Sequence, residues 1–155
     1  MLTLDYLKSL LFPDDQPDLD GITDKDQLLE TRSGMSGAIE LLQRKNLPAA
    51  VVLERPERHG FSLRNGGGRH SCTVSVWVME MVTANESAEE VMDRCLARVE
   101  RLYTILVGHF DDEQLGGWRE NSDVDAYERE TGSYAGYEMF IKFNESKDLS
   151  YVPRN

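Results

Sequence analysis

The chain has 155 residues, of which 40% are hydrophobic and 29% are charged, values typical of one globular domain and not of a disordered chain. This length is sufficient for a hydrophobic core without disulfides or a structural metal, and the apolar runs are too short to span a bilayer. The first residues lack the basic region and the long apolar stretch of a signal peptide. The formal net charge of −11 disfavours tight binding to nucleic acids and to anionic membranes.

Two helices are predicted in the N-terminal third. Leucines at helical spacing predict a short helix over residues 2–11. A longer helix is expected over residues 24–45, where the apolar positions form one broad stripe, with Thr23 or Asp24 as its N-cap. Two glycines weaken the middle of this helix, so a break near Ser33 is the alternative.

Two strands are predicted in the middle of the chain. Residues 49–53 indicate a short buried strand, and residues 71–82 indicate the clearest strand of the sequence. Residues 56–70 between them are expected to form a loop, because they contain the run Asn65-Gly66-Gly67-Gly68. The second strand is apolar on both faces, so Trp77 on one of them either packs under a helix or lies in a subunit interface.

The C-terminal half predicts the best helix of the chain and two further strands. Apolar residues from Ala88 to Leu106 form one continuous stripe, and Ser87 begins a capping box with Glu90. The expected elements are a helix over residues 87–107, an acidic loop over 111–121, and strands over 124–131 and 134–143.

Neighbouring strands around the long helix predict an α+β fold. We expect a mostly antiparallel sheet of about four strands, with helices packed on one side. One domain is predicted over residues 24–145. An N-terminal arm or short helix over residues 1–23 precedes it, and a loose tail over residues 146–155 follows.

The sequence carries no recognisable motif for catalysis or cofactor binding. The glycine run leads into a strand and lacks a lysine, so it does not fit a phosphate-binding loop. The acidic residues from His109 to Glu113 are better explained as solvated side chains than as a Mg²⁺ site. Cys72 and Cys95 are expected to be buried free thiols, which favours a reducing compartment, with a disulfide or a reactive thiol as the alternatives. We therefore predict no enzymatic activity, no metal and no cofactor.

Charge is distributed unevenly along the chain. Residues 111–130 carry eight acidic and two basic side chains, whereas residues 55–70 carry four arginines and two histidines against one glutamate. Opposite charges set the register and the encounter rate of two surfaces. We therefore expect the basic hairpin to contact the acidic segment of a neighbouring copy, a solvated loop being the alternative. The predicted interface residues are Arg55, Arg58, Arg64, Arg69, Trp77, Asp111, Asp112, Glu113, Asp123 and Asp125.

A fixed order of elements covers residues 35–145. A helix that ends before a proline is followed by a short strand at Pro48 to Leu53, a long polar hairpin loop and the long strand. The amphipathic helix and a closing strand pair that contains Tyr137-Glu138-Met139-Phe140-Ile141 complete the order. This order resembles that of the tail terminator and tail completion proteins of long-tailed bacteriophages. The first thirty residues and the long acidic stretch are additional to the family pattern.

The resemblance implies a small structural subunit that forms a ring, usually hexameric, between the tail tube and the head connector. Its partners would be its own copies and those tail and connector proteins, and it would be cytoplasmic before assembly and then part of the virion. A ring requires heterologous contacts, so high salt, or Arg58→Glu together with Arg64→Glu, is expected to dissociate it. The alternative function is a bacterial ligand-binding or adaptor domain with an apolar pocket near Trp77 and Tyr103.

Overall fold

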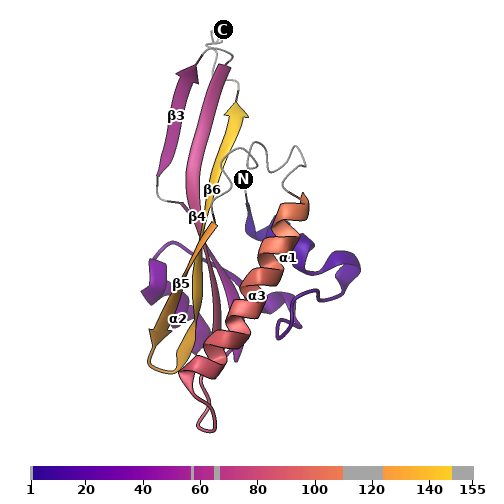
Figure 1. The fold of residues 1–155 in the computed structure, drawn as a ribbon, viewed down its shortest axis with the longest axis vertical. Helices are drawn as coiled ribbons and strands as arrows, with labels where there is room; N and C mark the ends of the chain where they lie inside the picture. Colours follow the sequence, from indigo (N-terminus) through magenta and orange to yellow (C-terminus); the bar gives the residue numbers. More distant parts are fainter. Residues whose placement is uncertain (1, 57, 65–66, 110–123, 148–155) are drawn as a thin grey trace.

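The computed structural model describes residues 2–56, 58–64, 67–109 and 124–147. One sheet runs through these residues, with helices packed against it (Figure 1). Within the described ranges, no helix combines the length and the apolar character needed to cross a bilayer. The elements in chain order are α1 (Leu4–Leu11), the 3-10 turns η1 (Pro13–Asp15) and η2 (Lys25–Gln27), β1 (Leu28–Thr31), α2 (Gly34–Lys45), β2 (Ala49–Glu54), β3 (His59–Arg64), β4 (Gly67–Met81), α3 (Ala88–His109), β5 (Val124–Thr131) and β6 (Tyr134–Lys147).

The described sheet has six strands, so the α+β class is confirmed and the expected number of about four strands is wrong. Five strands follow the order β1-β2-β4-β6-β5, and β3 pairs with β4 beyond the end of β2. Only β1 and β2 pair in parallel, and all other described pairings are antiparallel. The two strands that the sequence did not predict are β1 and β3.

The helix predicted over residues 24–45 is wrong in its first half. The carboxylate of Asp24 caps the short turn η2 and accepts from the backbone N–H of Asp26 at 2.8 Å. The next residues form β1, which pairs in parallel with β2. The helix α2 begins only at Gly34, whose φ of +63° lies outside the right-handed helical region. The predicted break near Ser33 therefore marks the start of the helix.

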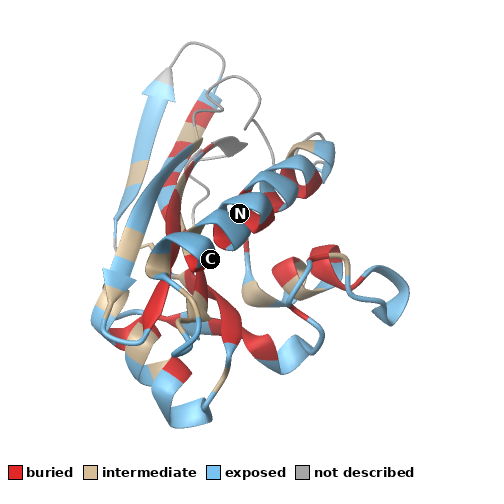
Figure 2. Ribbon diagram, turned by 60° about the horizontal axis from the view of Figure 1, so that its bottom comes forward, coloured by how far each residue is buried: buried red, intermediate tan, exposed pale blue. Residues whose placement is uncertain are grey.

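Helices cover both faces of the sheet, which corrects the expectation of helices on one side. Val74, Val76 and Val78 of β4 point into the main core beneath α1 and α3. The alternate residues Trp77 and Met79 point the other way and pack against α2 in a smaller core. Because β4 is apolar on both faces along this stretch, each face needs a helix to exclude water. Figure 2 shows the buried inner side of α3 and its exposed outer side.

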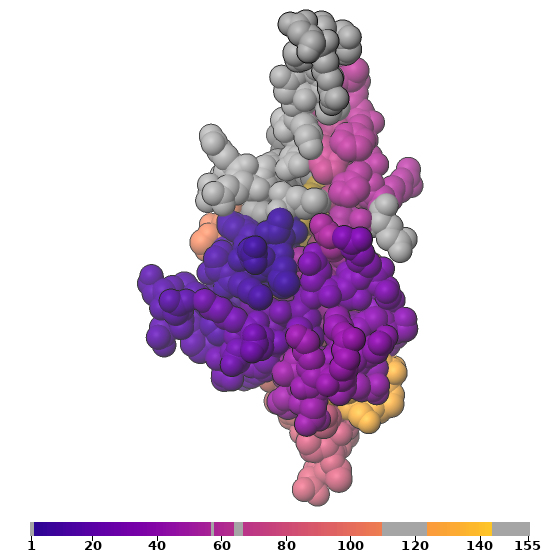
Figure 3. All heavy atoms as spheres, turned by 180° about the vertical axis from the view of Figure 1, so that it is seen from behind, coloured from indigo at the N-terminus to yellow at the C-terminus, as the bar shows by residue number. Residues whose placement is uncertain are grey.

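The N-terminal segment 1–23 contains α1 and contributes to the main core. The Thr3 hydroxyl caps α1 by accepting from the backbone N–H of Tyr6 at 3.2 Å. Leu7, Leu11 and Ile22 are buried in the same cluster as the valines of β4. Seen from behind in Figure 3, the indigo N-terminal residues lie against the body of the molecule. Much of this segment is thus packed as part of the domain.

Both cysteines are buried free thiols, as the sequence predicts. Burial raises the pKa of the Cys95 thiol to about 11, which leaves little thiolate near neutral pH.

In a Cys72→Ser variant, alkylation of Cys95 by iodoacetamide at pH 8 is therefore expected to be at least about 100-fold slower in the native protein than in urea. The rates can be measured by mass spectrometry. A native rate within tenfold of the unfolded rate would support the reactive-thiol alternative instead.

Candidate functional site

Three strand segments form an extension that projects beyond the helices in Figure 1. We define the arm as β3, residues 67–72 of β4 and residues 143–147 of β6, which pair in the order β3-β4-β6. β2 and β3 both run antiparallel to β4 along the same edge of it. The residues expected to form a loop over 56–70 are therefore mostly strand. The antiparallel pairing of β3 with β4 gives this hairpin regular backbone hydrogen bonding.

The outer strand of the arm presents apolar side chains to solvent. Phe61 is 61% exposed and Leu63 is 74% exposed. The Phe61 ring stacks on the His70 ring with 4.9 Å between the centroids. Among the described residues β3 pairs only with β4, so no described strand covers its outer backbone edge. An open edge with exposed apolar side chains is a surface on which another chain can pair.

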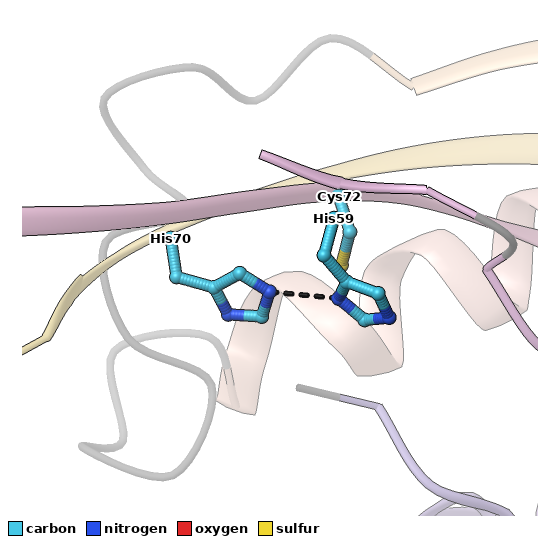
Figure 4. A group of neighbouring side chains, drawn as sticks. All are labelled: His59, His70 and Cys72. Atoms are coloured by element: carbon cyan, nitrogen blue, oxygen red, sulfur yellow. Dashed lines mark hydrogen bonds between the residues drawn. The ribbon is translucent and has the colours of Figure 1, made fainter. Parts of the chain in front are cut away.

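Two histidines and a cysteine meet at the base of the arm. His59 lies opposite Cys72 in the register of β3 and β4, and His70 lies on the same face of β4, two residues away. The His59 Nδ1 and His70 Nε2 atoms are 2.8 Å apart, and the two rings face each other in Figure 4. One ligand atom from each of the three residues lies within 4.8 Å of the others. His70 and Cys72 are buried, whereas His59 is exposed.

The strand β5 forms the opposite open edge of the sheet. It pairs with β6 and has no second neighbour among the described strands. Its exposed side chains include Asp125, Glu128 and the ring of Tyr127, which is 51% exposed. Arg129 lies 5.5 Å over that ring and forms an ion pair with the buried Glu138 at 3.1 Å. β5 is therefore an acidic edge that also displays an aromatic side chain.

The basic residues predicted at an interface have different surroundings. Arg55 pairs within the chain, with its Nε 3.2 Å from a carboxylate oxygen of Glu30 on β1. Arg58 is exposed and lines a cavity of about 570 Å³ at the base of the arm, next to Lys142. Arg69 is half-buried on β4. Of these three arginines, Arg58 is exposed and forms no ion pair within the described part of the chain.

Other predicted interface residues are buried or lie outside the described part of the chain. Trp77 is 3% exposed, and its Nε1–H donates to a carboxylate oxygen of Glu54 at 3.2 Å. Trp77 packs under α2, so of the two predicted surroundings, a covering helix and a subunit interface, the structure has the covering helix. Asp125 is exposed on β5. The side chain of Arg64, and the residues Asp111, Asp112, Glu113 and Asp123, lie outside the described residues, as does most of the segment considered for Mg²⁺.

Trp77 and Tyr103 do not line a common pocket. Trp77 belongs to the small core on the α2 face of the sheet. Tyr103 lies on α3, which packs against the opposite face, and its ring is 40% exposed. The two side chains that the ligand-binding alternative groups around one pocket therefore lie on opposite faces of the sheet.

The His59, His70 and Cys72 cluster was missed because the three residues show no metal-ligand spacing in the sequence. One signal could have revealed it. The dipeptide Asn65-Gly66 is the strongest short hairpin signal when strand-like residues flank it, and the register that pairs Arg64 with Gly67 sets His59 opposite Cys72.

Comparison with known proteins gives no assignment. No protein-family model matches the chain, and no curated protein matches it in sequence.

Proposed function

We propose that the protein is a non-enzymatic structural subunit that assembles with copies of itself through the arm. The observation that carries this proposal is the open edge of β3 with its exposed Phe61 and Leu63. Exposed aromatic and aliphatic groups are the usual centre of protein interfaces. The order of elements supports the narrower proposal of a phage or prophage tail terminator or tail completion protein.

The proposed contact joins the β3 edge of one subunit to the β5 edge of the next. These two edges are different surfaces, and repeating a contact between different surfaces generates a ring when the rotation closes. The β3 side carries Arg58 and His59, whereas β5 carries three carboxylates and one arginine. Each edge also exposes an aromatic ring, Phe61 on one and Tyr127 on the other. Charge and shape thus favour one orientation of the partners.

The double variant Phe61→Ser, Leu63→Ser is expected to weaken self-association at least tenfold, which corresponds to about 1.4 kcal/mol. Both side chains are exposed in the single chain, so their loss should affect the assembly more than the fold. Sedimentation velocity over a range of protein concentrations measures the effect. Negative-stain electron microscopy of the wild-type protein is expected to show closed rings.

The control for this variant is Leu96→Ser. Leu96 is an exposed leucine on α3 and belongs to neither edge strand, so its replacement should leave the assembly unchanged. A wild-type chain that stays monomeric at every concentration would overturn the proposal. Mixing the assembled protein with tail-tube and head-connector proteins would then test the phage assignment, since a tail terminator must bind both.

A further inference from the structure

We propose that His59, His70 and Cys72 form a binding site for a zinc-type transition-metal ion at the base of the arm. Two imidazoles and a thiolate are the ligand types that bind Zn²⁺ and the neighbouring late transition metals. The ligand atoms of the three residues all lie within 4.8 Å of one another. This site goes beyond the proposed assembly, because all its ligands come from one chain.

The strand pairing holds the three side chains on one face. His59 is directly opposite Cys72, and Phe61 is directly opposite His70, so the two histidines are diagonal neighbours across β3 and β4. The rings of His59 and His70 stack with 5.0 Å between their centroids. The ring of Phe61 also stacks on His70. Regular strands and packed rings fix the direction of the ligands before any ion binds.

The present geometry is close to that of a bound site. His59 Nδ1 and His70 Nε2 are 2.8 Å apart, the distance of a hydrogen bond between a protonated and an unprotonated ring nitrogen. In a tetrahedral site with Zn–N bonds of about 2.0–2.1 Å, the two nitrogens lie roughly 3.3 Å apart. An outward movement of about half an ångström therefore makes room for the ion, and the exposed His59 can move in this way.

The ligand set also discriminates between ions. The cluster offers nitrogen and sulphur among the described residues and no carboxylate, whereas Mg²⁺ and Ca²⁺ require oxygen ligands. Three protein ligands leave a fourth tetrahedral position for water or for an added ligand. Because the ligands come from β3 and β4, a bound ion would tie the outer strand of the arm to the central strand.

The test is a titration of the metal-free, full-length chain with Co²⁺ in the presence of excess Mg²⁺, followed by displacement with Zn²⁺. We expect one Co²⁺ per chain, with a thiolate-to-cobalt charge-transfer band and the visible bands of tetrahedral cobalt. Cys72→Ser should abolish the charge-transfer band, and His70→Ala should weaken binding at least tenfold. His109→Ala, which removes the exposed third histidine at the end of α3, is the matched control and should bind as the wild type does.

Circular dichroism of each variant shows whether it folds. If a variant at the buried His70 or Cys72 does not fold, His59→Ala still tests the site, because it removes an exposed ligand. Absence of stoichiometric Co²⁺ binding, or binding that His59→Ala leaves unchanged, would overturn the proposal. Excess Mg²⁺ occupies the surface carboxylates, so that weak binding of Co²⁺ to them is not mistaken for binding to the cluster. The titration is performed at a concentration where the chain is monomeric, so its result does not depend on the proposed assembly.

Discussion

Replacing Gly136 by alanine is expected to destabilise the protein by about 3 kcal/mol or more, because overpacking against a backbone cannot relax by side-chain rotation. Gly136 is buried on β6 opposite Met79 of β4, in the centre of the sheet. A Cβ atom there would lie 2.9 Å from the carbonyl carbon of Val78 and 3.0 Å from the Cα of Met79. Urea unfolding followed by circular dichroism measures the loss.

Gly108→Ala is the matched control for this substitution. Gly108 lies in α3, and a Cβ atom there would have no neighbour within 4 Å among the described residues beyond its own helix backbone. Since alanine is a better helix former than glycine, the control should be neutral or more stable by up to about 1 kcal/mol. If Gly136→Ala instead left the urea midpoint unchanged, the close approach of β4 and β6 would not limit the choice of residue at this position.

Elements whose pattern is local were predicted well. β5 was expected over residues 124–131 and has these bounds, and α3 differs from its prediction by two residues or fewer at each end. In α3 the Ser87 hydroxyl accepts from the backbone N–H of Glu90 at 3.2 Å, which is one of the two hydrogen bonds of the predicted capping box. In α3 the hydrophobic period and the N-terminal signal agree, and in β5 the turn signal at Gly132 marks the end of the strand, so both elements can be found from neighbouring residues in the sequence.

Elements that depend on distant partners were missed. Leu28 and Leu29 fit the helical stripe of the following segment, but their pairing with Val51 and Val52 of β2 makes them a strand. A four-residue strand has too few positions to show alternation. The prediction of helices on one side of the sheet was wrong for a related reason. Helix α2 connects the parallel strands β1 and β2, so its place on the sheet depends on a strand pairing that the sequence does not show.

The candidate site also combines a feature that is visible in the sequence with one that depends on distant partners. The basic character of the hairpin is visible in the sequence, whereas the proximity of His59, His70 and Cys72 requires the register of β3 on β4. A shift of one residue would place His59 on the opposite face from Cys72. Residue types predict a charged surface, which stays a prediction, whereas only the strand pairing reveals the cluster of metal-binding groups.

A buried ion-pair network joins three parts of the fold. Arg98 of α3 is 5% exposed, and its guanidinium lies 2.8 Å from a carboxylate oxygen of Glu80 on β4. Its Nε–H also donates to the backbone carbonyl of Asp20 at 2.7 Å. Arg94 pairs with the other oxygen of Glu80 and with Glu86. Helix α3, strand β4 and the N-terminal segment are thus connected through one carboxylate.

Glu80→Gln is expected to lower the free energy of unfolding by about 3 kcal/mol, because removal of one partner leaves the charge of Arg98 buried and uncompensated. Glu86→Gln is the control. Its carboxylate pairs with the more exposed Arg94 and accepts from the backbone N–H of Thr83 at 3.3 Å, a bond that the glutamine oxygen can keep, so the cost should stay below about 1 kcal/mol. Urea denaturation of both variants compares them directly. Equal losses would mean that water reaches Arg98 and screens its charge, whereas a larger loss for Glu80→Gln is expected for an arginine that is 5% exposed.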